Sequence, residues 1–384
     1  MSPVLSTDQI EQARAGLPYL RDVIYVDNAA VSPVPQAVQS AADRYNEHTV
    51  RRLREVSHLS EPVFDRGRVL AAKLVGVTAD QIAYVQNTSH GLSQIALGLD
   101  WRAGDNLVVP AQEFPSNHLC WLQLEAHGVE VRKVEAQAGR IHPADIGRHV
   151  DRRTRLVAIS HVQFYSGFRV DIPGIGELCR KAGALLVVDG TQSIGALTLD
   201  VSASGVDVLV VSGHKWMMAP RGIGFMALSE RALARITPRI VGWLSVKEPY
   251  AFRRTLDLLP DARRFESGTP NGSGIFGLAE RLRQIDELNP QAIEQRVIDL
   301  NRHLTERCAG AGLEILFRFD DRARSGIFLV RKPSVPAATV LAALAAAGIC
   351  ASVRSEAIRL SPHYYNTIDE LDHTVATIAS SVTA

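Results

Sequence analysis

Short apolar runs separated by polar segments recur along the chain and predict the strands of a largely parallel sheet. The two clearest runs are LLVV (185–188) and VDVLVV (206–211), which are rich in β-branched residues and too short to be buried helices. Segments 81–99 and 107–124 each predict a strand leading into a helix, and 156–175 predicts a strand followed by a polar and aromatic loop. This alternation of strands and helices is typical of an α/β fold.

Helical periodicity accounts for most of the remaining chain. A helix over 175–184 is predicted to cross back to the strand at 185, which completes a right-handed βαβ unit. A long amphipathic helix is expected over 285–310, and from about 311 short strands and helices alternate in an α+β pattern. The other predicted helices span 6–16, lie within 35–75, follow a cap at Asn271 or Ser273, span 336–347 and begin near Thr367.

Polar residues follow the two central strands at the point where each strand ends. Asp189 ends the first run, and Lys215 follows the second run just before a turn rich in glycine and proline. Because ligands of open α/β sheets bind at the C-terminal edge of the strands, we expect the Asp189 carboxylate and the Lys215 amine to converge on one site. The alternative is that Asp189 caps a turn and Lys215 is an ordinary surface lysine.

The convergence of an acid and a lysine suits pyridoxal 5'-phosphate (PLP) better than other cofactors. This cofactor needs a lysine amine for a Schiff base, an acidic group beside its pyridine nitrogen, and hydroxyl and N–H donors for its phosphate. Lys215, Asp189 and the polar set around Ser212 and His214 meet those needs. We therefore take Lys215, Asp189 and His214 as candidate catalytic residues.

A second candidate for the phosphate is the turn at 87–91, which precedes an apolar-striped helix. Free N–H groups and the helix dipole favour an anion at such a helix start. Thr88 and Ser89 are therefore candidate cofactor-binding residues. Capping of the helix is the more common use of these residue types, and both roles can hold together.

Composition and charge place the chain among ordinary globular proteins. It has 384 residues, of which 46% are hydrophobic and 22% charged, enough for a main domain and a smaller one. The formal net charge is +1, which provides no electrostatic footprint for nucleic acid or an acidic membrane. The chain start has no secretory pattern, and no run of about twenty apolar residues predicts a membrane span.

The four cysteines are widely scattered, which argues against a zinc site or a disulfide framework and fits a reducing cytoplasm.

Several motifs in the same order resemble the class V aminotransferases, a family of fold-type I PLP enzymes that includes cysteine desulfurases, isopenicillin N epimerase-like proteins and C–S lyases. These motifs are VVDGTQS (187–193), VSGHKWMMAPRGIG (211–224), FESGTPN (265–271) and IRLSPHYYNT (358–367). The resemblance begins at YVDNAA (25–30) and so covers nearly the whole chain.

The resemblance implies a fold-type I architecture. In that architecture a large domain has a mostly parallel seven-stranded sheet sandwiched by helices, and a small α+β domain follows it. The strand at 222–228 would be an antiparallel addition to the large sheet. We expect an N-terminal segment packed on the small domain over 1–20, the large PLP-binding domain over 21–284 and the small domain over 285–384.

The resemblance also implies roles for further residues around the cofactor. Gln192 would donate a hydrogen bond to the ring oxygen, and Phe114 would stack on the ring where relatives carry a histidine. Many relatives carry an asparagine near the position of Phe164, and here Gln163 or Tyr165 are open alternatives for reaching the ring hydroxyl.

Substrate and subunit contacts are implied in the same way. Arg359 matches the arginine that clamps the substrate α-carboxylate, a task suited to a guanidinium. Asn28 and Ala29 match a loop beside the substrate. Thr269 matches a threonine that reaches the partner's phosphate, which implies a homodimer.

The chemistry expected from these residues starts with removal of the substrate α-proton by Lys215, because burial lowers the pKa of an amine. Transamination, epimerisation and elimination of a side-chain group all remain possible from that point. The segment between Cys350 and Arg359 is too tight for the mobile loop that carries the nucleophilic cysteine of desulfurases.

We therefore favour a desulfurase-like C–S lyase without a cysteine nucleophile, acting on an α-amino acid. A class V aminotransferase, an isopenicillin N epimerase-like enzyme and a catalytically inactive PLP-binding homologue are the alternatives.

Overall fold

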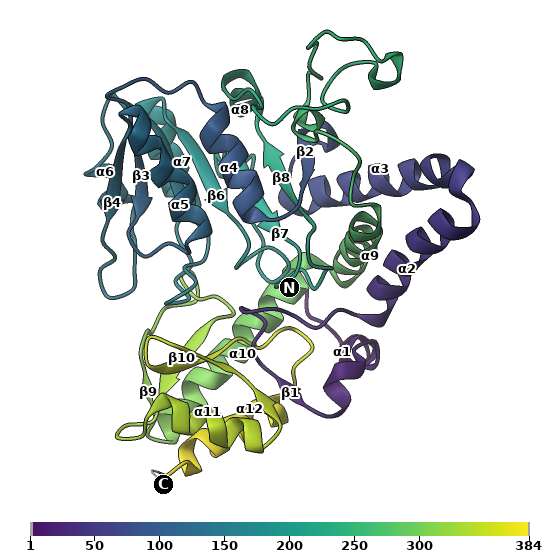
Figure 1. Cartoon of the computed structure of the whole chain (residues 1–384). Helices are drawn as coiled ribbons and strands as arrows, with labels where there is room; N and C mark the ends of the chain where they lie inside the picture. The colour runs from purple at the N-terminus through teal and green to yellow at the C-terminus, as the bar shows by residue number, and fades with distance from the viewer. Residues whose placement is uncertain (1–2, 383–384) are drawn as a thin grey trace.

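The computed structural model describes residues 3–382 and contains a seven-stranded sheet between two layers of helices (Figure 1). Along each central strand, neighbouring side chains alternate between two separate hydrophobic clusters. Leu185 and Val187 belong to one cluster, whereas Leu186 and Val188 belong to the other. Because both faces of the sheet are covered, its strands need apolar residues at every position, which explains the continuous runs in the sequence.

The order of strands in this sheet is β2-β8-β7-β6-β5-β3-β4. Every neighbouring pair from β7 to β4 is parallel, and β8 is antiparallel to both of its neighbours. The mostly parallel sheet and the antiparallel strand after Lys215 are therefore confirmed. The strands are β2 (Ile82–Val85), β3 (Asn106–Pro110), β4 (Glu130–Val134), β5 (Thr154–Ser160), β6 (Leu185–Asp189), β7 (Val208–Ser212) and β8 (Gly224–Leu228).

Helices cover both faces of the sheet. The face that holds Leu185 packs against helices α4 (Thr88–Gly98), α5 (Ser116–Leu122) and α8 (Glu230–Arg235). The face that holds Leu186 packs against helices α3 (Val56–Val75), α6 (Pro143–Gly147), α7 (Ile172–Ala182) and α9 (Gly272–Leu288).

Three of these elements, β4, α6 and α8, were not predicted. β4 is an edge strand whose first four residues are exposed or half-buried, so its sequence lacks an apolar run.

Among residues 3–382, no helix combines the length and the apolar character needed to cross a bilayer.

Two predicted helices differ from the observed ones at their ends. The periodic segment 35–75 contains helix α2 (Gln36–Arg51) and α3, which are separated by a short 3-10 turn. The helix expected over 285–310 is α10 (Pro290–Gly310), and residues 285–288 belong to α9. Asn289 has a φ of +68° and Pro290 follows it, which interrupts the helical backbone between α9 and α10. The boundary between the large and the small domain at 284–285 stays a prediction. It would divide α9 in its last turn.

The C-terminal part has its own hydrophobic cluster and its own sheet. Its four strands are antiparallel and run in the order β12 (Ser352–Arg354), β13 (Ala357–Leu360), β10 (Phe328–Arg331) and β9 (Glu314–Ile315). Helices α11 (Ala337–Ala346) and α12 (Ile368–Ser380) complete it. The α+β alternation expected after residue 311 is thus present.

The N-terminal segment contacts this C-terminal part. Strand β1 (Ile24–Tyr25) pairs with β11 (Ile349–Cys350), and Arg14 of helix α1 (Thr7–Ala15) forms an ion pair of 2.6 Å with Glu370. These contacts bring the loop after β1 beside β13, where Arg359 lies.

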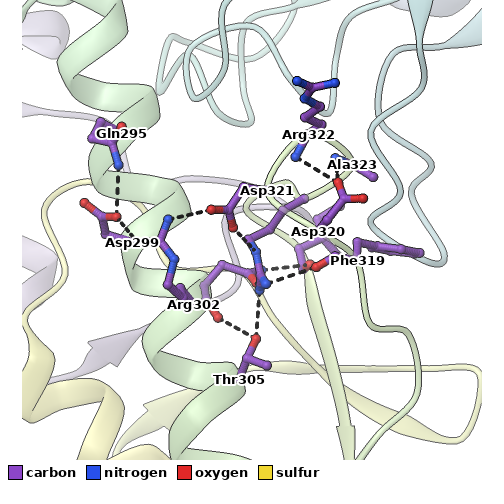
Figure 2. A network of polar contacts seen from close by, with 12 residues as sticks. Gln295, Asp299, Arg302, Thr305, Phe319, Asp320, Asp321, Arg322 and Ala323 are labelled. Carbon is purple, nitrogen blue, oxygen red and sulfur yellow. Dashed lines mark hydrogen bonds and ion pairs between the residues drawn. The ribbon is translucent and has the colours of Figure 1, made fainter. Parts of the chain in front are cut away.

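Polar contacts hold the loop between β9 and β10 against α10 (Figure 2). Arg324 donates to Asn301 Oδ1 at 2.7 Å and to Thr305 Oγ1 at 2.8 Å, and Arg302 pairs with Asp321 at 2.9 Å. The same loop accepts a hydrogen bond of 2.8 Å from the Arg169 amide, which follows β5. The loop therefore joins the small sheet to the C-terminal edge of the large one.

Candidate active site

A cavity of about 330 Å³ lies at the C-terminal ends of β6 and β7. It brings together most of the residues singled out from the sequence: Ala29, Thr88, Ser89, Phe114, Asp189, Gln192, Ser212, His214, Lys215 and Arg359. The wall also contains Ala30, which belongs to the loop predicted to lie beside the substrate, and residues without a predicted role there: Asn87, Ser116, Ser160, Phe164, Thr191 and Arg354.

Lys215 is half-buried in this cavity, at the end of the turn that follows β7. Its ammonium lies 5.1 Å from the centre of the Phe114 ring. Burial lowers the pKa of Lys215 to about 8, and the nearby charges of Arg359 and Arg354 act in the same direction, whereas Asp189 opposes them. A substantial fraction of this amine is therefore neutral near physiological pH.

Asp189 is the last residue of β6, and its side chain is buried. Burial raises the pKa of this carboxyl, while a hydrogen bond of 2.8 Å from the Thr191 amide and the charge of Lys215 oppose the rise. A buried carboxylate is stabilised when a cation joins it. The protonated pyridine nitrogen of PLP is such a cation.

Three hydroxyl groups meet at the start of α4. Thr88 Oγ1 lies 2.7 Å from Ser212 Oγ and 2.6 Å from Thr191 Oγ1, and the Thr88 amide donates to Ser212 Oγ at 2.8 Å. The N-cap of α4 is Asn87, which accepts from the His90 amide, so neither Thr88 nor Ser89 caps the helix. The hydroxyls and the helix start together form a donor set that fits a phosphate.

Two further groups lie beside this donor set. Ser89 Oγ is 2.7 Å from Ser116 Oγ at the start of α5. Burial, with the charges of Lys215 and Arg221 acting in the same direction, lowers the pKa of His214 to about 4. His214 is therefore a neutral hydrogen-bonding group at physiological pH.

Two aromatic rings form one wall of the cavity. Phe114 and Phe164 contact each other edge to face, with ring centres 5.3 Å apart. Gln163 and Tyr165, the alternatives left open by the sequence, are not among the residues lining this cavity. Gln163 instead donates to the buried Glu113 at 3.0 Å, and burial raises the pKa of Glu113 to about 7.

Arg359 extends from β13 and is almost fully buried. Its Nη2 lies 3.2 Å from Asp27 Oδ1 and its Nε lies 3.2 Å from Ser352 Oγ, which itself donates to Asp27 Oδ1 at 2.7 Å. Burial lowers the pKa of Arg359, and Asp27 opposes this effect. Asp27 and Ser352 thus hold the guanidinium in place.

Two predicted site residues do not line the cavity. The Asn28 side chain is fully buried and accepts from Ser32 Oγ at 2.8 Å and Tyr365 Oη at 2.9 Å. Its Nδ2 donates to Ser361 O at 2.9 Å, so the Asn28 amide supports the loop and only Ala29 and Ala30 reach the cavity. Thr269 is exposed and lines a separate hollow of about 350 Å³.

Some of the missed residues had a signal in the sequence. Ser160 ends β5 and Thr191 lies two residues after Asp189, so both lie at the strand edge that the pattern predicted. Asp27 and Arg354 had none, because neither follows a strand of the large sheet and their position depends on the pairing of β1 with β11 and of β12 with β13.

Comparisons with known proteins agree with this arrangement. The family model for class V aminotransferases matches residues 24–373. A probable cysteine desulfurase of Methanothermobacter thermautotrophicus is 32% identical over 299 residues, which cover 77% of this chain and 74% of the relative. A probable cysteine desulfurase of Pyrococcus abyssi is 31% identical over 77% of this chain and 75% of its own.

Solved structures show the same fold. The apo cysteine desulfurase of Thermococcus onnurineus superposes with a TM-score of 0.87 at 26% identity, covering 98% of each chain. The cystine C–S lyase C-DES, in complex with its product cysteine persulfide, superposes with a TM-score of 0.88 at 22% identity over 95% of this chain and 99% of its own.

The fold and the site therefore define a fold-type I PLP-dependent enzyme. The chain belongs to the class V aminotransferase family. Its cofactor is PLP, and the lysine, the buried carboxylate and the hydroxyl cluster of the cavity fit the three chemical requirements of that cofactor.

Proposed function

We propose that this enzyme is a C–S lyase that eliminates the sulfur-bearing group of a cysteine-like amino acid without a cysteine nucleophile. The observation that carries the proposal is the placement of Lys215, Asp189 and Arg359 around one cavity, on a chain that is similar to probable cysteine desulfurases. The four cysteines lie in α5, α7, α10 and β11, all within the described residues, and none is among the lining residues.

Each lining residue has a defined task in this proposal. When bound, PLP supplies an electron sink for the negative charge that develops at the substrate Cα. Asp189 would face the pyridine nitrogen, Gln192 would donate to the ring oxygen, and Phe114 would stack on the ring. Thr88, Ser89, Ser212 and His214 would hold the phosphate.

The substrate is oriented by Arg359, whose planar guanidinium suits an α-carboxylate. Ala29 lies beside it and leaves room for the amino acid because its side chain is small. Lys215 takes the α-proton, since its pKa of about 8 leaves enough neutral amine at physiological pH to act as a base.

We also infer a homodimer in which Thr269 contributes to the partner's phosphate site. The exposed position of Thr269, outside the cavity of its own chain, supports this inference. A reducing cytoplasm is the inferred location, supported by four free thiols.

The test is product analysis with the purified holoenzyme and a panel that includes cysteine and cystine. Pyruvate together with sulfide or persulfide is expected, with the cofactor unchanged after turnover. Accumulation of the pyridoxamine form with a keto acid would instead indicate an aminotransferase. Recovery of the mirror-image amino acid would indicate an epimerase.

Lys215→Ala is the control for this assay, because it removes the amine while Asp189 and Arg359 remain. Borohydride treatment followed by mass spectrometry should place a pyridoxyl group on Lys215 in the parent protein and none in the variant. A label on another lysine would contradict the assigned site.

A further inference from the structure

The indole of Trp216, the residue after Lys215, occupies a closed slot between the large sheet and the C-terminal part. Trp216 is fully buried. A Cβ added to Gly326 would meet its ring at 2.3 Å, and a Cβ added to Gly195 would meet its carbonyl oxygen at 2.5 Å. The missing side chain at Gly326 thus leaves room for the indole, and the missing side chain at Gly195 leaves room for the Trp216 backbone.

The indole N–H fixes which way the Gln192 amide points. Trp216 Nε1 donates to Gln192 Oε1 at 3.0 Å, and Gln192 Nε2 donates to the Ala29 carbonyl at 3.0 Å. An indole N–H can only donate and a backbone carbonyl can only accept, so both contacts require the same orientation of the amide. In a flipped amide, the NH2 group would face the indole N–H of Trp216 and the oxygen would face the carbonyl oxygen of Ala29.

This orientation decides what Gln192 presents to the cavity. Nε2 carries two protons, and one is used by Ala29. The second donates to no other group among residues 3–382, and Gln192 lines the cavity. The cavity therefore has a fixed N–H donor at this point.

Trp216 is itself held by a histidine of the C-terminal part. His363 Nδ1 accepts from the Tyr364 amide at 2.8 Å, so His363 Nε2 carries the proton that it shares with the Trp216 carbonyl at 2.8 Å. Burial lowers the pKa of His363 to about 3. The histidine is therefore neutral, and its tautomer is set by its two partners.

We propose that Trp216 is a positioning residue that acts through Gln192: it keeps the amide N–H, and not the amide oxygen, directed at the ring oxygen of PLP. His363 holds Trp216 in place for this task. The inference rests on the proposed contact between Gln192 and the cofactor ring.

The test is a pH titration of the visible absorbance of the holoenzyme, compared with its Trp216→Phe and Gln192→Met variants. An N–H donor stabilises negative charge on the ring oxygen, so its loss should raise the apparent pKa of the bound cofactor by about one unit. Both variants should show this rise. The double variant should show no further rise, because Trp216 acts only through Gln192.

Trp121→Phe is the matched control, because Trp121 is also fully buried and donates to a side-chain amide, that of Asn117, at 3.1 Å. Its cofactor pKa should equal that of the parent. If Trp216→Phe does not fold, benzothienylalanine at position 216 replaces only the N–H by sulfur and should produce the same rise.

Two outcomes are distinguishable. A Gln192→Met variant with the parent pKa would overturn the proposed contact of Gln192 with the ring. A rise in Gln192→Met with none in Trp216→Phe or in the sulfur analogue would overturn the role of Trp216 alone.

Discussion

Lys215 combines a covalent attachment role with acid–base chemistry, and burial is the main reason that it can do both. Its pKa of about 8 results from desolvation together with two arginines, against which the Asp189 charge acts. The two arginines differ in their surroundings, since Arg359 is buried beside Asp27 whereas Arg354 is exposed. Arg354 can therefore be altered with little structural cost.

The rate at which the cofactor-free protein captures PLP should rise with pH, with a midpoint near pH 8, because only the neutral amine reacts. Arg354→Gln removes a charge that lowers this pKa. The midpoint of the rate against pH should therefore be higher in this variant than in the parent. The shift should be only roughly 0.3 pH unit, because solvent screens an exposed charge. Stopped-flow absorbance from pH 6 to pH 10 measures both values.

Arg180→Gln, at an exposed position on α7, should keep the parent midpoint in the same experiment. A parent midpoint near 10.5, the value of an unperturbed lysine, would show that the amine is not desolvated.

Helix α3 makes two ion pairs, one mostly buried and one exposed to solvent. Arg68 contacts both oxygens of Glu266, at 2.5 and 2.8 Å, and Glu266 Oε1 also accepts from the Tyr84 amide of β2 at 2.7 Å. Lys73 pairs with Asp286 of α9 at 2.6 Å, but its side chain is 66% exposed. The first pair anchors α3 to the edge strand of the large sheet, whereas the second lies in solvent.

Arg68→Met should destabilise the protein by about 3 kcal/mol, because it leaves the Glu266 carboxylate buried without its cation. Lys73→Met should cost less than about 1 kcal/mol. Urea unfolding followed by circular dichroism measures both.

Arg68→Met combined with Glu266→Gln should lose less stability than Arg68→Met alone, because no unpaired charge remains while the Tyr84 amide keeps an acceptor. Equal losses of stability in Arg68→Met and Lys73→Met would contradict the conclusion that the Arg68–Glu266 pair is buried and the Lys73–Asp286 pair is exposed.

The whole molecule builds its site from both ends of the chain. Ala29 follows β1, Asp189 and Lys215 follow strands of the large sheet, and Arg359 comes from the small sheet. In the inferred dimer, Thr269 of each chain would add a contact to the other site.

Mixing two inactive variants tests this inference. Lys215→Ala removes the amine of one chain, and Thr269→Ala weakens phosphate binding when the assay uses limiting PLP. If Thr269 acts across the interface, each mixed dimer has one intact site, and an equal mixture should regain about one quarter of the wild-type activity.

Light scattering should show a particle of twice 41.9 kDa for each variant and for the mixture. No recovery in a mixture that has exchanged subunits would place Thr269 in the site of its own chain, and wild-type activity of Thr269→Ala by itself at limiting PLP would place it outside any site.

Local pattern was enough to predict much of this protein. The runs at 185–188 and 206–211 are strands because both faces of the sheet are buried. Asp189 and Lys215 share a cavity because parallel strands end at one edge. These features depend on neighbours within a few residues and on a general rule of α/β sheets.

Tertiary structure alone decided the contacts between distant segments. Asp27 meets Arg359, and Trp216 meets both Gln192 and His363, through pairings of segments that no local pattern predicts. Tertiary contacts can also remove a predicted residue from the site. The Asn28 amide is held away from the cavity by hydrogen bonds with Ser32, Ser361 and Tyr365. Chain periodicity determines which residues reach the sheet edge, whereas the hydrogen-bond partners of each polar side chain depend on which distant segments pack beside it.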